Sequence, residues 1–436
     1  MKYKQIRYDG HMEKYILDFS KDLINFIDAS PLNYFAVKNA GEILEANGFK
    51  KLREDQVWDL KKGKFYTTRD DSALIAFEIG EEIEKGFEII GSHTDSPTFK
   101  VKSKPEMADT GFLKLNIEAY GGMIHSTWLD RTLSLAGKVA YKKDGKIKYE
   151  LVNIDKDLLT IANAAIHMNR EINKGYAYNA QDNLYPLVKT IKDELEGDSY
   201  LVNILAEELG INPEDILDFD LGLYDRQKGA IINDMVHVGR LDNLGSVHAS
   251  LMALVDSKPG RNKMILLSDN EEIGSSTRGG AASNLLGNTL ERIALKFGLD
   301  REGYQIMVEN SMIISADQAH ATHPNYKAFA DPTNIVKMNE GLVIKIAANG
   351  AYASTIETKA RLINIAKKYG YKFQTFHNRN DKQGGSTIGP ITSTALGIKA
   401  VDVGIPLLAM HSIRELAGVE DIYQAYDIYK KFFEED

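Results

Sequence analysis

The chain has 436 residues, 43% of them hydrophobic and 26% charged, with a formal net charge of −9 and no cysteine. Because this length exceeds the usual limit for one hydrophobic core, we expect two domains, or one domain with a large insertion. The negative charge argues against nucleic-acid partners, and the absence of cysteine excludes disulfides, thiolate metal ligands and cysteine nucleophiles.

The N-terminal segment MKYKQIRYDGHMEKYILDF carries charges throughout. It lacks the apolar core and small-residue cleavage site of a secretory signal. No stretch of the chain reaches the roughly 18 consecutive apolar residues of a membrane span. We therefore expect a cytoplasmic protein with no membrane partner.

Two helices are predicted at the start of the chain. Apolar residues recur at helical spacing from residue 12 onward, namely Ile16, Phe19, Leu23 and Phe26. The sequence ASPLNY interrupts this pattern, and a second helix is expected over Ala36–Ala46. The apolar run Phe87–Ile90 then predicts a buried strand.

The character of the sequence changes near Lys100. Apolar and polar residues alternate over 113–119, which predicts a strand with one wet face. Further alternation in 133–141 and 146–152, joined through Asp144-Gly145, predicts a hairpin. A helical stretch is expected near 155–210. Residues 100–236 are therefore predicted to form a β-rich inserted domain.

Alternation of strands and helices returns after this insertion. Apolar runs alternate with helices expected at 243–255, 282–297, 353–369 and 416–433. The fold class predicted for the remaining chain is α/β, with helices on both faces of a mixed, largely parallel sheet. Residues 1–99 and 237–436 would then be the two parts of a single catalytic domain.

Four apolar runs each lead into residues that can bind a metal. Phe87–Ile90 precedes His93 and Asp95, Met264–Leu267 precedes Glu271 and Glu272, Met312–Ile314 precedes Asp317, and Leu407–Met410 precedes His411. The carboxyl ends of parallel strands are where such sheets place their chemistry. With Asp242 at the start of a predicted helix, these ends predict a hydrolase site that holds more than one metal ion.

Taken singly, each of these motifs has a structural alternative. His93 and Asp95 could belong to a turn, Asp242 is a natural helix N-cap, and the adjacent glutamates could lie on a solvated loop. In the functional interpretation, one of the two glutamates binds metal and the other carries a proton. A nucleophilic Ser386 is not supported, because no G-x-S-x-G elbow surrounds it.

Five motifs together resemble the aspartyl aminopeptidase and vacuolar aminopeptidase I family of dinuclear zinc exopeptidases. They are GSHTDSP, RLDNLGS, DNEEIGS, SADQAHATHPNY and MHSIRE, and they follow one another over nearly the whole chain. The resemblance implies a zinc-exopeptidase-like catalytic domain interrupted by a β-rich dimerisation domain. It also implies a homo-oligomer, with dimers assembled into a tetrahedral dodecamer, and peptides as substrates.

The resemblance also implies a role for each site residue. One zinc is held by His93 and Asp317, the other by Glu272 and His411, and Asp242 bridges the two ions. Asp95 orients His93, and Glu271 is the general base. Substrate contacts are implied for His320, Lys345 and Tyr352, and for His167, which reaches a neighbouring subunit. Histidine and carboxylate ligands also accept cobalt or manganese.

Several functional alternatives remain open. The apolar segment IAANGA after Lys345 leaves both acidic and neutral first residues of the substrate possible. A zinc carboxypeptidase or deacylase of related fold is the nearest alternative enzyme. A metal-stabilised assembly protein without catalysis is a third interpretation, although Asp95 and Glu271, which are not needed to hold metal, speak against it.

Overall fold

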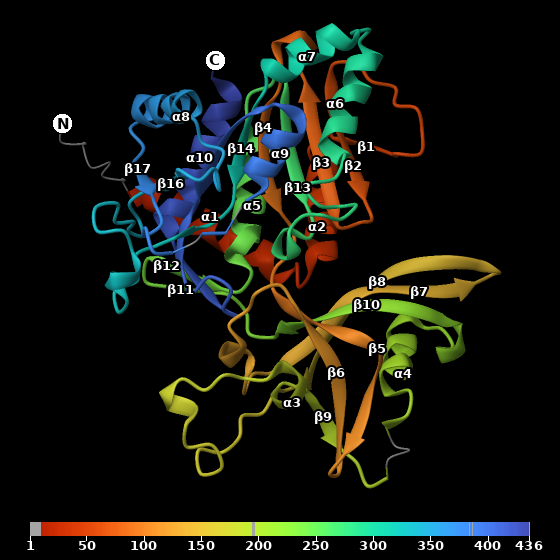
Figure 1. Cartoon of the computed structure of the whole chain (residues 1–436). Helices are drawn as coiled ribbons and strands as arrows, with labels where there is room; N and C mark the ends of the chain where they lie inside the picture. Colours follow the sequence, from red (N-terminus) through yellow and green to blue (C-terminus); the bar gives the residue numbers. More distant parts are fainter. Residues whose placement is uncertain (1–9, 194–196, 383, 386, 436) are drawn as a thin grey trace. The chain divides into compact units, whose positions relative to one another are not determined.

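The computed structural model describes residues 10–193, 197–382, 384–385 and 387–435, so Ser386 lies outside the described residues. The chain divides into two compact units (Figure 1). The first unit contains the chain up to Asp95, Gly229–Met410 and the residues from Glu415 onward. The second contains Ser96–Lys228 and the short segment His411–Arg414. No helix in the described part of the chain is long and apolar enough to cross a lipid bilayer.

A nine-stranded sheet forms the centre of the first unit (Figure 1). In spatial order its strands are β1 (Lys50–Leu52), β2 (Gly63–Arg69), β3 (Ala73–Ile79), β13 (Lys263–Ser268), β4 (Glu88–His93), β14 (Met312–Ala316), β18 (Lys399–Gly404), β16 (Leu342–Lys345) and β17 (Phe373–Phe376). The middle strands β13, β4, β14 and β18 run parallel to one another. This confirms the predicted mixed, largely parallel α/β sheet.

The middle strands are apolar on both faces because each face packs against helices. In β4, Ile89 and Ile90 are both fully buried, but they belong to two different hydrophobic cores. Successive residues of a strand point to opposite faces, so a continuous apolar run is what a doubly covered strand requires. The two cores therefore lie on the two faces of the sheet.

Helices supply the other half of each core. One face packs against α1 (Gly10–Asp28), α2 (Asn33–Ala46), α5 (Leu241–Asp256), α8 (Ile356–Tyr369) and α10 (Val419–Glu434). The other face packs against α6 (Leu285–Lys296) and α7 (Arg301–Glu309), and α9 (Ile388–Leu396) contacts β14 and β18. The helices predicted near 243–255, 282–297, 353–369 and 416–433 correspond to α5, α6, α8 and α10. The helices α7 and α9 were not predicted.

A five-stranded sheet completes the first unit. Its strands, in spatial order, are β11 (Ala230–Ile232), β12 (Met235–Val238), β20 (Glu415–Gly418), β19 (Pro406–Leu408) and β15 (Ala319–His320). The prediction of one buried parallel strand leading directly to His411 was wrong, because VDVGIPLLAM is divided between β18 and β19. Strand β18 ends at Gly404, and β19 begins at Pro406. Any residue with a Cβ atom at position 404 would place that atom 2.2 Å from the Asp317 carbonyl oxygen, so only glycine fits there.

The second unit is built on a six-stranded antiparallel sheet. Its spatial order is β8 (Lys146–Leu159), β7 (Leu133–Lys143), β10 (Ile216–Asp225), β5 (Thr98–Asp109), β6 (Phe112–Tyr120) and β9 (Leu187–Thr190). The predicted hairpin joins β7 to β8, and Asp144 and Gly145 both have positive φ, as a tight hairpin turn requires.

The helical stretch expected near 155–210 was largely wrong. Strand β8 continues to Leu159, which pairs with Leu133 of β7. Beyond it, in the described residues up to 210, the α-helices are the short α3 (Ala180–Asn183) and α4 (Tyr200–Leu209), and Ile172–Lys174 forms a 3-10 turn. Pairing with β7 therefore decides the structure of residues 155–159.

We expect Leu266→Ala to destabilise the fold by about 2–5 kcal/mol, because it leaves a cavity between β13 and its helices. Leu266 is 2% exposed, whereas Leu295 on α6 is 67% exposed. Leu295→Ala, the matched control, should change stability by no more than about 0.5 kcal/mol. Urea unfolding of both variants under identical conditions is the measurement. Equal effects of the two substitutions would contradict the assignment of Leu266 to the core.

Candidate metal centre

The site of the first unit lies where its parallel middle strands end. His93 is the last residue of β4, and it pairs in register with Ser268, the last residue of β13. Asp317 follows the last residue of β14 directly, and Glu271 comes three residues after β13. Because β13, β4 and β14 are parallel neighbours, these residues all emerge at the same edge of the sheet.

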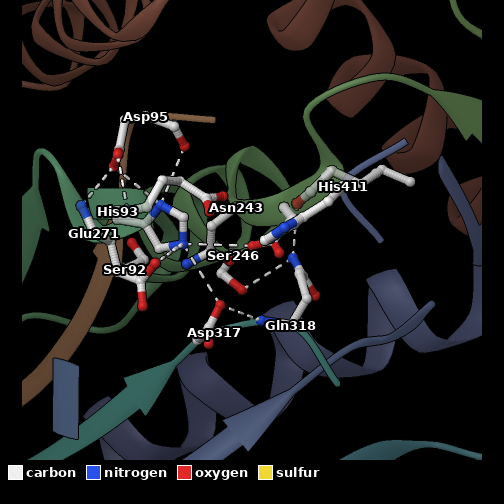
Figure 2. Close-up of polar contacts among 12 residues, drawn as sticks. Ser92, His93, Asp95, Asn243, Ser246, Glu271, Asp317, Gln318 and His411 are labelled. Carbon is white, nitrogen blue, oxygen red and sulfur yellow. Dashed lines mark hydrogen bonds and ion pairs between the residues drawn. The ribbon is translucent and has the colours of Figure 1, made fainter. Parts of the chain in front are cut away.

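The imidazole of His93 stands at the centre of this edge (Figure 2). Its Nε2 atom lies 3.4 Å from Oδ1 of Asp242, 3.5 Å from Oδ1 of Asp317 and 3.9 Å from Oε2 of Glu271. The histidine is 1% exposed, so these charges meet away from bulk water. One ring nitrogen therefore faces carboxylates from three different elements of the fold.

The other ring nitrogen of His93 is held by Asp95. His93 Nδ1 lies 3.2 Å from Asp95 Oδ1 and 3.1 Å from the Asp95 carbonyl oxygen. Both oxygens accept, so Nδ1 carries the hydrogen and Nε2 is left to act as a ligand. The Asp95 carboxylate also accepts the backbone N–H groups of Glu271 and Glu272, each at 3.1 Å. Asp95 thus contacts both the imidazole and the loop that bears the two glutamates.

Asp242 lies at the start of α5 but does not have helical backbone angles. Its φ and ψ are −83° and 103°, and its peptide bond to Asn243 is cis. Its backbone N–H donates to Oε2 of Glu415 at 2.9 Å. The side chain, 3.4 Å from His93, faces the site, which favours the ligand interpretation over a plain helix cap.

Two amide side chains that sequence reasoning missed hold α5 against the end of β14. Asn243 Nδ2 donates to the Ala316 carbonyl at 2.8 Å, and Gln318 Nε2 donates to the Leu241 carbonyl at the same distance (Figure 2). Asn243 directly follows Asp242, and Gln318 directly follows Asp317, so the two bonds connect the segments that bear these aspartates. Asn243 lies in the motif RLDNLGS and Gln318 in SADQAHATHPNY. Nothing in the sequence alone distinguishes an amide that joins two segments from an amide on the surface.

The side chains of this edge fit a metal ion. Ligand atoms of His93, Asp242 and Asp317 lie within 4.8 Å of one another, and so do those of His93, Glu271 and Glu272. Burial lowers the pKa of His93, but hydrogen bonds to Asp242, Asp317 and Asp95 raise it well above its ordinary value. The carboxylates therefore favour a cation beside Nε2, and imidazole nitrogen and carboxylate oxygen are donors that zinc accepts.

Asp317 divides its two oxygens between His93 and a buried lysine. Oδ1 faces His93, while Oδ2 accepts a hydrogen bond of 3.0 Å from Nζ of Lys345, the last residue of β16. Burial raises the pKa of Asp317, but Lys345 and His93 lower it further, so the net shift is downward. Lys345 is 3% exposed, and its Nζ lies 5.5 Å from the ring centre of Tyr352.

Two carboxyl groups near the site have raised pKa values. Burial raises the pKa of Glu271 to about 7; His93 opposes this rise, and Asp317, Asp242 and Asp95 add to it. Burial and the charge of Asp95 raise the pKa of Asp269 to about 6. Asp269 follows β13 directly and accepts a hydrogen bond from Asn33. Its supporting role was not predicted, although it stands in the same SDNEE motif.

Of three further predicted residues, two are exposed and one is half-buried. His320, at the end of β15, is exposed and lines a cavity of about 260 Å³ with Phe376 and His377. His167 is exposed in a turn of the second unit, between exposed Ile166 and Met168. His411 is half-buried in the segment that belongs to the second unit, where its Nδ1 lies 2.6 Å from the Gly122 carbonyl oxygen.

Comparison with known proteins identifies the family. The sequence profile of the aminopeptidase I zinc metalloproteases (M18) matches residues 26–433. A probable M18 family aminopeptidase 2 of Clostridium novyi is 46% identical over 96% of this chain and 99% of its own length. The corresponding protein of Stutzerimonas stutzeri is 39% identical over 95% of this chain and 98% of its own.

Solved structures agree with the sequence comparison. Yeast aminopeptidase 1 (Ape1) superposes with a TM-score of 0.85 at 29% identity, over 96% of this chain and 97% of that one. A chain from the complex of Ape4 and Nbr1 superposes with a TM-score of 0.94 at 34% identity, over 98% of this chain and 87% of that one. The predicted resemblance is therefore confirmed. The chain belongs to the M18 family of zinc metalloproteases and is a zinc aminopeptidase.

Proposed function

We propose that this zinc aminopeptidase is a dinuclear enzyme that removes single residues from the N-terminus of peptides. The observation that carries the proposal is the arrangement around His93, in which one imidazole nitrogen faces Asp242, Asp317 and Glu271 while Asp95 holds the other. An isolated structural ion does not need a carboxylate beyond its ligands. The surplus of carboxylates supports a second metal position and a proton carrier.

His93 and Asp317 would hold one ion, Glu272 and His411 the other, and Asp242 would lie between the two. The proposal for His411 rests on the motif MHSIRE and on chain connectivity. His411 comes three residues after Leu408, where β19 ends. It comes four residues before Glu415, and the Glu415 carboxylate accepts the Asp242 N–H. Zinc bound here would act as a Lewis acid toward water and the scissile carbonyl, and cobalt or manganese could replace it.

Glu271 is proposed as the general base and Asp95 as the residue that orients His93. Glu271 Oε2 is the farthest of the three carboxylate oxygens from His93 Nε2, at 3.9 Å, so it can face a water molecule rather than an ion. It would take a proton from that water and deliver it to the leaving amine. The acidic surroundings attract the free amino group of a peptide, which favours exopeptidase action.

His320 and Tyr352 are proposed to contact the substrate, whereas Lys345 is proposed to act first through Asp317. Its ammonium group is already bonded to Asp317 Oδ2 and lies over the Tyr352 ring. A lysine engaged in this way has little charge to offer an acidic substrate side chain. The geometry thus favours neutral first residues.

A panel of aminoacyl substrates with acidic through hydrophobic first residues tests the function directly. Free-amine substrates should be cleaved, the same substrates should resist cleavage after N-acetylation, and each active subunit should contain two zinc ions by elemental analysis. Cleavage of acetylated substrates would favour the deacylase alternative, and release of C-terminal residues would favour the carboxypeptidase. Two bound ions without any hydrolysis would favour a metal-stabilised assembly protein.

Neutralising the two neighbouring glutamates should impair different properties of the enzyme, namely turnover for Glu271 and zinc binding for Glu272. Glu271→Gln should keep both metals and lower turnover by about 10²–10⁴-fold, because general-base catalysis contributes roughly this much. Glu272→Gln should instead weaken the binding of one zinc, because it removes a ligand charge. Metal content, melting temperature and kcat are measured on the same preparations. Metal loss in Glu271→Gln alone would reverse the two roles.

We also propose that the enzyme is a homo-oligomer, a tetrahedral dodecamer built from dimers, in which residues 100–236 mediate dimerisation. A related yeast protein, mApe1, has been solved as a dodecamer, with a TM-score of 0.84 and 29% identity. His167 supports a contact with a neighbouring subunit, because it is exposed between Ile166 and Met168, which are 46% and 83% exposed. A cytoplasmic location stays a prediction.

Complementation tests whether His167 serves a neighbouring subunit. His167→Ala and Glu271→Gln should each be nearly inactive alone, because each lacks one part of every site. Co-expression should restore turnover, since a mixed pair combines an intact Glu271 with an intact His167 of the neighbour. Purification through two different affinity tags, one on each variant, establishes that the mixed oligomers form. Full activity of His167→Ala by itself, or mixed oligomers without activity, would contradict the proposal.

A further inference from the structure

A second buried carboxylate, Asp402, lies in β18 beside the strand that leads to Asp317. Asp402 pairs in register with Ser315 of β14, two residues before Asp317, and it is 0% exposed. A buried carboxylate is costly unless its oxygens are hydrogen-bonded. Its partners therefore indicate what it contributes to the molecule.

The Asp402 carboxylate ties two separate segments to the central sheet. Oδ2 accepts the backbone N–H of Ala353 at 2.6 Å, and Oδ1 accepts the hydroxyl of Thr387 at 2.5 Å. The backbone N–H of Asp402 in turn donates to Ser354 Oγ at 2.9 Å. Ala353 and Ser354 come directly after Tyr352, and Thr387 is the residue from which α9 begins.

The start of α9 approaches this carboxylate closely. A Cβ atom at position 389 would lie 2.5 Å from Asp402 Oδ1. A side chain there would therefore displace either the start of α9 or the Asp402 carboxylate. Burial raises the pKa of Asp402, but Thr387 and Lys345 are among the groups that lower it. Asp402 thus interacts with the same lysine that holds Asp317.

We propose that Asp402 is a positioning residue of the active site, which fastens the segment bearing Tyr352 and the start of α9 to β18. This inference rests on the proposed function, in which Tyr352 contacts the substrate and Lys345 holds Asp317. Asp402 does not touch the substrate in this scheme. It sets the place of one wall of the site, so its loss weakens substrate binding before it affects metal binding.

The chain offers a matched control, because a second buried aspartate holds the segment on the other side of β16. Asp421, at the start of α10, is also 0% exposed, and it accepts the backbone N–H groups of Asn339 and Gly341 just before β16 begins. Asp402 holds the segment after β16, and Asp421 holds the segment before it. Both aspartates are buried acceptors of backbone N–H groups, but the segment held by Asp421 contains no proposed site residue.

Kinetics should separate the two aspartates. Asp402→Ala should raise KM for a cleaved aminoacyl substrate by at least about tenfold, with zinc content unchanged, because small misplacements of binding groups are costly. Asp402→Asn should recover most of this loss, since its carbonyl can accept from Ala353 while Thr387 accepts from its amide. Asp421→Ala should lower the melting temperature and leave KM within about twofold of the wild type.

Hydrogen–deuterium exchange provides a readout that does not depend on activity. Asp402→Ala should speed exchange in peptides covering 346–355, whereas Asp421→Ala should speed it at 339–341. Should Asp402→Ala fail to fold, Thr387→Val removes one tether and should still raise KM, though by less. Unchanged exchange at 346–355, or equal KM increases from both aspartates, would overturn the inference. Absence of cleavage by the wild type would instead reject the proposed function and leave the exchange result decisive.

Discussion

The site depends on keeping several carboxylates together out of water. Around His93, the side chains of Asp242, Asp317 and Glu271 approach one ring nitrogen from three different elements. Like charges in a poorly solvated place repel one another and lose hydration, so each must be compensated by a cation or by hydrogen bonds. Lys345 supplies one such positive charge at Asp317. The carboxylates also raise the pKa of His93, which shows that they favour a further positive charge beside them.

The fold supplies the rigidity that this crowding requires. The strands β13, β4 and β14 are buried on both faces, and they end at one edge of the sheet. Amide groups of Asn243 and Gln318 fix the beginning of α5 against the end of β14. Groups on packed strands are placed more accurately than groups on loops, and metal and catalytic sites require that accuracy.

Much of this arrangement could be predicted from the sequence, because the strands at the site are unbroken apolar runs and each precedes a polar motif. The α/β class, the middle strands and four of the later helices followed from those patterns. The helix expected near 155–210 failed at its start, because residues up to Leu159 belong to β8 and pair with β7. The split between β18 and β19 was missed because the two strands pair in different sheets, with β14 and with β20, and this pairing exists only in the folded chain. Lys345 shows the same limit, since its bond to Asp317 joins residues 28 positions apart.

Asp95 has a consequence for how metals would load into a two-ion site. Its carboxylate contacts the His93 ring and also accepts the N–H groups of Glu271 and Glu272. Ligands proposed for the two different positions therefore share one support, so ordering one position also orders the other. By thermodynamic linkage, an ion that binds at either position then changes the affinity of its neighbour by the same factor. In the proposed two-ion site, binding at the two positions would therefore be coupled through Asp95.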